Sequence, residues 1–430
     1  MWSGRCYGGT QSSLFLSASS TVYCYYFAWF SLLLHENASL TSSFLLRGLA
    51  NFVFELSYGL LFSGVMQHQE DYTSNASKDD QYFDSYADLS VHKVMLCDRP
   101  RMDFYKTLLT DRSIVEGKVV VDVGSGSGIL SCWAAQSGAA HVLSVEASSL
   151  AEVQQQIMSD NGLSDRVTVI ASTVEELVAA GVEAFVKEHP CVRDHSGVAL
   201  VVSEWMGFYL FHECMLRSVI RARDFFRDVN AALQSSVPVS MLPSSGRLLA
   251  APITLHPYYT ETFAAFWDSV DGVSLRTLGK LQFEEHIEAT SPLVDVIPAP
   301  CLLHDGVVLW EGSFDTLAVD DLASIEAERT FDFSTSVTTT SAKASLGATG
   351  RFTVDGFTLW FQVSYRDVVL DTSPFAPPTH WKQTTVLLPR EFRDDKTVSF
   401  HRLDEQLEVT LRLTAEDPVQ RCYRIEFELN

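Results

Sequence analysis

The sequence lacks any paired-cysteine motif. Its eight cysteines are scattered along the chain, with no CxxC pair and no regular spacing. This pattern indicates neither a zinc site nor a disulfide framework, and we expect no metal site. Several cysteines lie inside apolar runs, as buried free thiols usually do, so a reducing compartment fits best. We also find no internal repeat.

Positive charge is scarce as well. The chain has 31 Lys and Arg against 54 Asp and Glu, which gives a formal net charge of −23. The few charges of residues 1–66 cancel, so the whole deficit lies in residues 67–430. A surface this acidic repels nucleic-acid phosphate and attracts basic ligands. The charge therefore argues against direct nucleic-acid binding and permits a basic protein substrate. It does not establish such a substrate, because acidic surfaces mostly serve solubility.

Charged side chains are absent from residues 6–34. Residues 15–34 are rich in aromatic and aliphatic side chains, and their length could span a bilayer, which needs roughly 20 apolar residues. The stretch contains many Ser and Thr, however, and only Arg5 stands before it as a positive flank. A second apolar stretch, 49–66, is interrupted by Glu55.

Three interpretations of the apolar segment 1–66 are open: a membrane anchor, a targeting segment, or sequence upstream of the true start. Met66 is followed at once by the polar run 67–71, after which the pattern of a soluble domain begins. We favour Met66 as the functional start, together with a cytoplasmic or nuclear location. Membrane association is expected only if residues 1–65 are present and act as an anchor.

The rest of the chain divides by pattern. With 430 residues, of which 47% are hydrophobic and 20% charged, it is long enough for two domains of about 100–200 residues each. Up to about residue 235, helical patterns alternate with short apolar runs, which predicts a parallel α/β sheet. The expected strands are 119–123, 142–145, 167–170 and 198–202, with helical patterns at 82–109 and 129–137 and a solvent-exposed insertion at 181–197.

After about residue 235 the pattern becomes all-β. Runs that alternate or are rich in β-formers, separated by Gly and Pro, lie at 247–255, 306–311, 351–363 and 407–413. The boundary is expected near Pro238–Pro243. We therefore predict N-terminal helices and a cofactor-binding α/β domain over 67–237, followed by an all-β domain over 238–430.

A glycine loop, Gly124-Ser125-Gly126-Ser127-Gly128, follows the first expected strand and opens a helix. Its glycines allow the backbone to approach a ligand that a Cβ would exclude. Glu146 ends the next strand, 20 residues beyond Gly126, where a carboxylate can accept bonds from both ribose hydroxyls. This arrangement suits any adenosine cofactor, nicotinamide dinucleotides included.

The spacing of the loop, GxGxG rather than GxGxxG, favours S-adenosylmethionine. That cofactor has no pyrophosphate, so its amino-acid carboxylate needs a separate cation. Arg101 is the candidate, because a guanidinium binds a carboxylate through two hydrogen bonds.

Two glutamates, Glu204 and Glu213, lie nine residues apart just after the fourth expected strand. Gly207 between them permits a hairpin that folds both carboxylates over the end of the strand. Such a pair could hold a metal, act as acid and base, or bind a cation. Only His212 is near and no metal-ligand spacing is evident, which argues against a metal. Two close carboxylates repel each other unless a cation lies between them, and a guanidinium is planar, forked and positive.

Four stretches together resemble the type I protein arginine methyltransferases. SEWMG-x5-E (203–213) is similar to the double-glutamate loop of that family, and Thr379-His380-Trp381 resembles its THW loop. Tyr82-Phe83-Asp84-Ser85-Tyr86 resembles its opening YFxxY motif, and VDVGSGSGIL (121–130), followed by VEAS (145–148), resembles its cofactor loop. The stretches span roughly residues 80–425 in the family's order, a combination far more specific than any one motif.

The resemblance implies a Rossmann-like S-adenosylmethionine-binding domain, a β-barrel domain and a helical dimerisation arm. The arm would lie at about 258–283, including Phe266, Trp267 and Leu275, and would form head-to-tail homodimers. The implied partners are arginine-rich protein substrates, either Gly-Arg-rich or histone-like.

The resemblance also implies roles for individual residues. Arg101 would bind the methionine carboxylate, Glu146 the ribose, and Glu175 with the Val174 backbone the adenine. The full set of implied cofactor residues is His92, Arg101, Asp122, Gly124, Gly126, Gly128, Glu146, Val174 and Glu175. The implied catalytic residues are Glu204, Glu213, His380 and Asp98. The implied substrate pocket consists of Tyr82, Tyr86, Met95, Met215 and Trp381.

Met95, Met215 and the intact YFxxY motif agree with asymmetric dimethylarginine as the product. The chain departs from the family at Lys93 and Val94, where two glutamates are usual, and at Phe208, which replaces a common tyrosine. Residues 229–243 are longer than usual here and lack glycine. None of these departures touches the carboxylate pair.

Two other functions compete with this one. A small-molecule methyltransferase would share the glycine loop and Glu146, but it would have no reason to keep both the glutamate hairpin and the THW loop. A catalytically weak or partner-dependent scaffold would be expected to lose Glu204, Glu213 or Arg101, and all three are present.

Overall fold

The computed structural model describes residues 88–289, 292–334, 351–390, 393, 400–402, 406–415 and 421–429. All of these ranges belong to one compact unit, Ser74–Asn430. The predictions for residues 1–66 and for Tyr82 and Tyr86 lie outside the described residues. Among the helices that the structure describes, none combines the length and the apolar character needed to cross a membrane.

The first domain is built on a parallel sheet in the order β3-β2-β1-β4-β5. The four predicted strands are confirmed, with ends that shift by at most one residue, and a fifth strand lies at 240–242. Every residue of β1 is buried, and all but Asp122 are valines, as expected for a parallel strand covered on both faces. The strands are β1 Val119–Val123, β2 His141–Glu146, β3 Val167–Ala171, β4 Val198–Val202 and β5 Ser240–Leu242.

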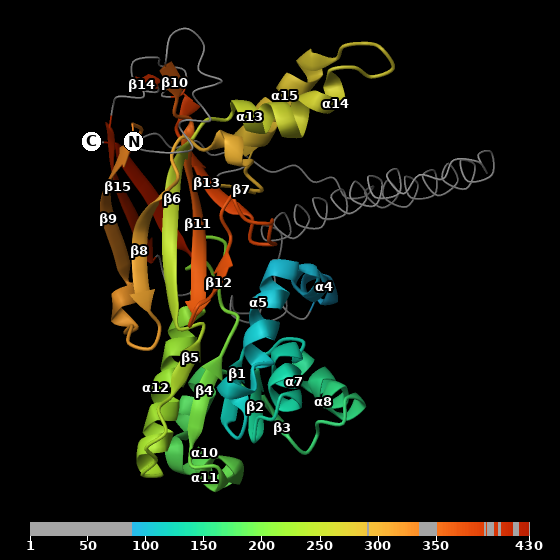
Figure 1. Cartoon of the computed structure of the whole chain (residues 1–430), viewed down its shortest axis with the longest axis vertical. Coiled ribbons are helices and arrows are strands. Elements are labelled where there is room, and N and C mark those ends of the chain that lie inside the picture. Colours follow the sequence, from blue (N-terminus) through green and yellow to red (C-terminus); the bar gives the residue numbers. More distant parts are fainter. Residues whose placement is uncertain are drawn as a thin grey trace, which may run out of the picture. The chain divides into compact units, whose positions relative to one another are not determined.

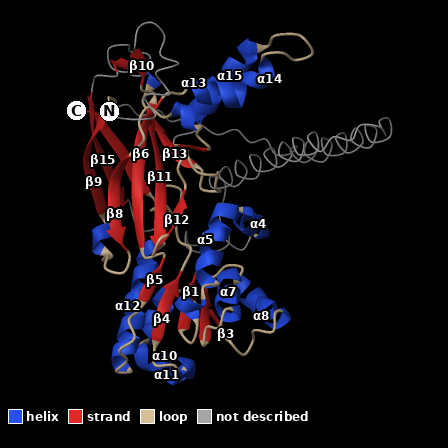
Figure 2. Cartoon of the chain, viewed as in Figure 1, coloured by secondary structure: helices blue, strands red, loops and turns tan. Residues whose placement is uncertain are grey.

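Helices accompany this sheet, as the blue ribbons around its red strands show (Figure 2). The expected helical stretch over 82–109 is wrong in one respect, because it breaks at Asp98 into two helices. Asp98 accepts the Arg101 N–H and so caps the second helix, whose first turn contains Pro100. The helices are α4 Leu89–Cys97, α5 Arg99–Leu109, α6 Arg112–Val115, α7 Ile129–Gln136, α8 Leu150–Asp160, α9 Val174–Ala180, α10 Val182–Glu188, α11 Pro190–Asp194 and α12 Leu216–Ala232.

The insertion at 181–197 is only partly the solvent-exposed segment that its composition suggests. It forms α10 and α11, which bury Phe185 and Val192. The Phe185 ring packs edge-on against Phe225 and Phe226 of α12, with ring centroids 5.4 and 5.5 Å apart. Helices this short do not show a hydrophobic period long enough to recognise.

The second domain is all-β, as predicted, and its strands are antiparallel (Figure 1). One sheet has the order β7-β13-β11-β6-β8 with β12 paired to β11, a second has the order β16-β15-β9, and β10 pairs with β14. β5 (240–242) pairs with β4 in the parallel sheet of the first domain. The predicted domain bounds, 67–237 and 238–430, stay a prediction. The strands are β6 Ser245–Ile253, β7 Leu293–Asp295, β8 Val307–Ser313, β9 Ser324–Asp332, β10 Arg351–Thr353, β11 Gly356–Tyr365, β12 Val368–Asp371, β13 Gln383–Leu387, β14 Phe400–Arg402, β15 Gln406–Ala415 and β16 Tyr423–Leu429.

A helical arm follows β6, close to the predicted residues 258–283. It consists of α13 His256–Tyr258, the π-helical turn η1 Tyr259–Ala264, α14 Ala265–Trp267 and α15 Arg276–Ala289. Phe266, Leu278 and Leu281 on the arm are 66%, 46% and 55% exposed. Apolar side chains gathered on one exposed element are typical of a surface that another protein chain covers.

Candidate active site

The glycine loop lies at the carboxyl end of β1, in backbone conformations that other residues avoid. Gly124, Gly126 and Gly128 have φ of 68°, 53° and 75°, in the left-handed region that favours glycine. A Cβ on Gly126 would lie 2.9 Å from Cε1 of His92, and a Cβ on Gly124 would overlap the methyl group of Met215. The loop therefore brings together His92 of α4 and Met215, which directly precedes α12.

Glu146 ends β2 with its carboxylate buried beside this loop. Oε2 accepts the Gly126 N–H at 2.7 Å, and Oε1 accepts the Ser148 N–H at 2.8 Å. Hydrogen bonds to an ionised carboxylate are the strong ones, so the orientation of Glu146 is fixed. This is the position at which Rossmann-like folds bind an adenosine ribose.

The predicted adenine residues lie at the start of α9. Val174 is buried in the first turn of that helix. The carboxylate of Glu175 accepts hydrogen bonds from Ser218 Oγ at 2.8 Å and Arg221 Nη1 at 3.0 Å, both on α12. Its side chain is 48% exposed, so α12 holds a partly open carboxylate in place.

The two predicted catalytic glutamates lie on a tight hairpin after β4. Gly207 and Leu210 exchange backbone hydrogen bonds, and a Cβ on Gly207 would overlap the His212 carbonyl. Glu213 has a φ of 72°, a conformation that non-glycine residues rarely adopt and that is concentrated at functional sites. The hairpin thus holds Glu204 at the end of β4 and turns the chain at Glu213 just before α12.

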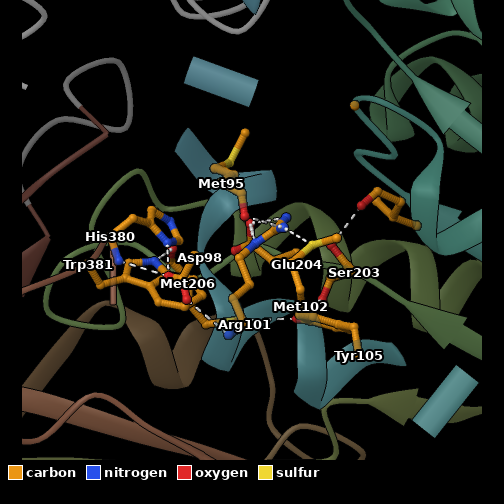
Figure 3. A network of polar contacts seen from close by, with 12 residues as sticks. Met95, Asp98, Arg101, Met102, Tyr105, Ser203, Glu204, Met206, His380 and Trp381 are labelled. Atoms are coloured by element: carbon orange, nitrogen blue, oxygen red, sulfur yellow. Dashed lines mark hydrogen bonds and ion pairs between the residues drawn. The ribbon is translucent and has the colours of Figure 1, made fainter. Parts of the chain in front are cut away.

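Glu204 already binds a guanidinium group in this structure (Figure 3). Nε and Nη2 of Arg101 donate to Oε2 of Glu204 at 3.1 and 2.9 Å, and the two side chains are 8% and 10% exposed. Arg101 also donates from Nη1 to the Met95 carbonyl at 3.2 Å. Among the described residues, no donor is bonded to Oε1 of Glu204. Oε1 therefore keeps its capacity to accept hydrogen bonds.

Asp98 and His380 form a buried pair that joins the first helices to the THW loop. Oδ2 of Asp98 accepts the His380 backbone N–H at 2.8 Å and lies 2.6 Å from Nδ1. Burial alone would raise the pKa of Asp98, but the hydrogen bonds and charge of His380 outweigh it and hold that pKa below its ordinary value. Because the carboxylate is ionised, Nδ1 must be the donor, and Nε2 is left to exchange a proton elsewhere.

Trp381 ties the same loop to the glutamate hairpin. Its ring centroid lies 4.0 Å from that of His380, and its Nε1 donates to the Met206 carbonyl at 2.6 Å. On the other side, the Tyr105 hydroxyl of α5 donates to the Ser203 carbonyl at 3.0 Å. Figure 3 shows these contacts around Arg101 and Glu204, so α5, the hairpin and the THW loop meet at one place.

Asp122, one of the predicted cofactor residues, belongs to β1 and is fully buried. Oδ2 lies 3.1 Å from the Ser131 N and 2.7 Å from Ser131 Oγ, and Oδ1 has no hydrogen-bond partner among the described residues. Burial raises the pKa of Asp122 to about 7, and the negative charge of Glu146 also raises it. The hydrogen bonds from Ser131 and the positive charge of Arg101 lower this pKa, but they do not outweigh burial. Asp122 therefore binds the first turn of α7, the helix that follows the glycine loop.

Comparison with known proteins decides the family. The family model "Arginine methyltransferase oligomerization subdomain" matches residues 244–430, and "Ribosomal protein L11 methyltransferase" matches residues 107–186. Protein arginine N-methyltransferase 6 of Danio rerio is 32% identical over 365 residues, which cover 82% of this chain and 90% of the relative. The chain belongs to the protein arginine N-methyltransferase family.

Further members of the protein arginine N-methyltransferase family are also similar to this chain over most of its length. The probable protein arginine N-methyltransferase 6 of Arabidopsis thaliana is 30% identical, covering 74% of this chain and 73% of the relative. A crystal structure of PRMT6-SAH has a TM-score of 0.76 and 47% identity over 80% of this chain and 100% of that one. The heterotetrameric PRMT1 enzyme-prozyme complex of Trypanosoma brucei with AdoHcy has a TM-score of 0.54 and 26% identity over 80% and 99%. The Rossmann-like domain followed by a barrel domain is thus the architecture of the family, as the sequence predicts.

The departures from the arginine methyltransferase pattern lie beside the site. Lys93 is exposed and Val94 is buried on α4, and the Phe208 ring packs 5.5 Å from His212.

The groups of His, Cys, Asp and Glu in the described residues include none that could hold a metal ion.

Sequence reasoning missed the residues that tie this site together. Tyr105 carried a signal, since it lies one turn after Arg101 on the same face of α5. The carbonyls of Ser203 and Met206 carried none, because any residue supplies a backbone acceptor.

Proposed function

We propose that this chain transfers methyl groups from S-adenosylmethionine to arginine side chains of proteins, giving monomethylarginine and asymmetric dimethylarginine. The observation that carries the proposal is Glu204, a carboxylate only 10% exposed that binds a guanidinium at 2.9 Å and shares its hairpin with Glu213. Membership of the arginine methyltransferase family supports the same activity.

The residues around the glycine loop fit this cofactor. The loop brings backbone within reach of a ligand because Cβ atoms are absent at three positions where φ is positive. Glu146 would accept the ribose hydroxyls, Arg101 would bind the methionine carboxylate, and Glu175 with the Val174 backbone would bind the adenine. When bound, the cofactor supplies an electrophilic methyl group on a sulfonium sulfur. His92 of α4 would pack against Gly126 of the loop, and Asp122 of β1 would hold the start of α7 through Ser131.

Glu204 and Glu213 would hold the target guanidinium between two carboxylates. Oε2 of Glu204 already carries Arg101, which leaves Oε1 for the substrate. A buried carboxylate attracts a guanidinium more strongly than an exposed one, because water screens the charges less. The pair would hold one terminal nitrogen of the substrate toward the methyl group that the cofactor supplies, and positioning and electrostatics would provide most of the rate.

His380 would take up the proton that the reaction releases. A guanidinium has a pKa above about 12 and is a poor nucleophile until it loses a proton. Asp98 orients the imidazole through Nδ1, so Nε2 is the nitrogen that can accept. Trp381 would form a wall of the arginine pocket next to His380.

The asymmetric product is proposed from Met95, Met215 and the YFxxY motif. The Met215 methyl group lies against Gly124, and the Met95 carbonyl is held by Arg101. With Tyr82 and Tyr86, these side chains would shape the space available to a second methyl group on the same nitrogen.

The partners proposed are arginine-rich proteins and a second copy of this chain. A net charge of −23 favours encounter with basic Gly-Arg-rich or histone-like segments. The exposed apolar side chains of the arm support a homodimer. We propose a cytoplasmic or nuclear location, with membrane association only if residues 1–65 act as an anchor.

The test uses the full chain, labelled S-adenosylmethionine and an Arg-Gly-rich peptide, with methylarginines resolved by mass spectrometry. Monomethylarginine followed by asymmetric dimethylarginine is expected. Symmetric dimethylarginine would contradict the product assignment alone. Cofactor binding without transfer to several arginine-rich substrates would contradict the activity and favour a scaffold, with Lys93 and Val94 the first positions to revert.

A further inference from the structure

One fully buried glutamine, Gln154 of α8, contacts the glycine loop. It lies four residues from Leu150 and four from Met158, on the buried stripe of the helix. Its neighbours Gln155 and Gln156 are exposed. A buried amide must find hydrogen-bond partners, because leaving one unpaired is costly.

Gln154 uses its whole side-chain amide on the loop and on β2. Nε2 donates to Ser125 Oγ at 2.8 Å and to the Gly126 carbonyl at 2.6 Å. Oε1 accepts from Ser144 Oγ of β2 at 2.8 Å. A Cβ on Gly128 would lie 3.4 Å from Cδ of Gln154, so the side chain packs against three of the five loop residues.

The directions of these hydrogen bonds follow from counting protons. Ser144 gives its one hydroxyl proton to Gln154, so at its 3.0 Å contact with Ser131 Oγ it must accept. Ser131 has one hydroxyl proton, and Asp122 Oδ2 at 2.7 Å and Ser144 Oγ at 3.0 Å are its two acceptors. Ser144 gives its own proton to Oε1 of Gln154, so Oε1 is the acceptor and both Nε2 protons are available to the loop.

Gly126 is held from both sides as a result. Its N–H donates to Glu146 and its carbonyl accepts from Gln154, at 2.7 and 2.6 Å. The residue has a φ of 53°, and the two bonds together fix the peptide planes on either side of it. The same arrangement couples the proposed ribose carboxylate to the loop.

We propose that Gln154 is a positioning residue for the cofactor, which holds the Gly126 backbone and, through it, Glu146 in the geometry that binds the adenosyl group. The inference rests on the proposed function, since it assumes that the loop binds S-adenosylmethionine. Gln154 itself does not touch the reacting atoms.

The test compares Gln154→Glu and Gln154→Leu with the wild-type full chain. Neither replacement can donate to Ser125 and Gly126 near neutral pH, while Glu keeps the size of the side chain. We expect the Kd for S-adenosylhomocysteine, measured by calorimetry, to rise about 10- to 100-fold in both. The KM for S-adenosylmethionine should rise with it, whereas the KM for the peptide and kcat at saturating cofactor should stay within about twofold of wild type.

Gln155→Glu is the matched control, because it makes the same charge change on the exposed face of the same helix. It should leave the Kd and both KM values unchanged. If the Gln154 variants do not fold, Ser144→Ala decides, since it removes the donor that orients the amide and should raise the Kd about 3- to 10-fold.

The outcomes separate the two claims. A wild-type chain that does not bind S-adenosylhomocysteine would overturn the proposed function. The positioning role alone would be overturned if the wild-type chain binds S-adenosylhomocysteine and the folded Gln154 variants bind it equally well. It would also be overturned if those variants show a changed KM for the peptide and a lower kcat in place of a higher Kd. An unchanged Kd in Ser144→Ala, where that variant has to decide, would overturn it too.

Discussion

Replacing Asp98 by Asn changes one atom of a carboxylate that three donors share. Asp98 accepts the Arg101 N–H at 3.1 Å on one oxygen, and the His380 N–H and Nδ1 at 2.8 and 2.6 Å on the other. If the Asn amide oxygen keeps the cap of α5, its NH2 group faces His380, and the buried His380 N–H loses its acceptor. If the amide flips, the cap is lost instead.

Either orientation removes the charge that holds the imidazole. Hydrogen bonds to charged groups contribute about 1.5–3 kcal/mol, which corresponds to roughly a 10- to 100-fold decrease in kcat. We expect the Kd for S-adenosylhomocysteine to stay within about threefold of wild type, because Arg101, which we propose to bind the cofactor, keeps its bonds to Glu204. Steady-state kinetics with an Arg-Gly peptide and calorimetry measure the two effects separately.

The matched control is Asp111→Asn, which changes the N-cap carboxylate of α6 and lies outside the site. It should leave kcat unchanged. A wild-type kcat in Asp98→Asn would refute the role given to the pair. Because the pKa of Asp98 is lowered from 3.8, its carboxylate stabilises the folded chain above about pH 4, and the stability difference between variant and wild type should shrink only as the pH falls below that value.

Three further predictions concern stability and assembly. The pKa of Asp122 rises from 3.8 to about 7, so the folded chain binds more protons between these values and loses stability as the pH rises through that window. Asp122→Asn should remove about 3 kcal/mol of that loss between pH 4.5 and pH 7.5 in denaturant titrations, and parallel curves for variant and wild type would contradict it. Leu281→Glu on the arm should convert a dimer into a monomer in sedimentation experiments, whereas Val369→Glu, which is 54% exposed outside the arm, should not. Trp381→Phe should lower the free energy of unfolding by about 1–3 kcal/mol, because the buried Met206 carbonyl loses its donor, and a Tm equal to that of wild type would argue against this bond.

The sequence predicted most of the first domain because its signals are local. β1 and β4 begin and end at the predicted residues, and the glycine loop lies between β1 and α7 as expected. Apolar β-branched runs have few alternatives to a buried parallel strand, and a glycine-rich turn after one of them places the loop. The order of the motifs along the chain then indicated the family.

What the sequence did not reveal depends on contacts between distant residues. The break at Asp98 has a local signal, an Asp followed two residues later by Pro100. The contact of the same carboxylate with His380, 282 residues further on, has no local signal and was implied only by the resemblance. The pairing of Arg101 with Glu204 likewise joins residues 103 positions apart. Gln154 did carry a local signal, a polar residue on the buried stripe of α8, but its meaning requires the position of Gly126.

The most direct test of the account measures Glu204→Gln for cofactor binding and methyl transfer in parallel. Gln keeps an oxygen that can accept from Arg101, so the fold and the Kd for S-adenosylhomocysteine should be preserved within about threefold, while the charge that holds the target guanidinium is lost. Transfer should fall at least about 100-fold, and Glu311→Gln, which removes a carboxylate paired with Arg247 on the surface, should transfer normally. Transfer by Glu204→Gln at the wild-type rate, or a loss of transfer explained entirely by lost cofactor binding, would contradict the claim that this carboxylate binds the substrate arginine.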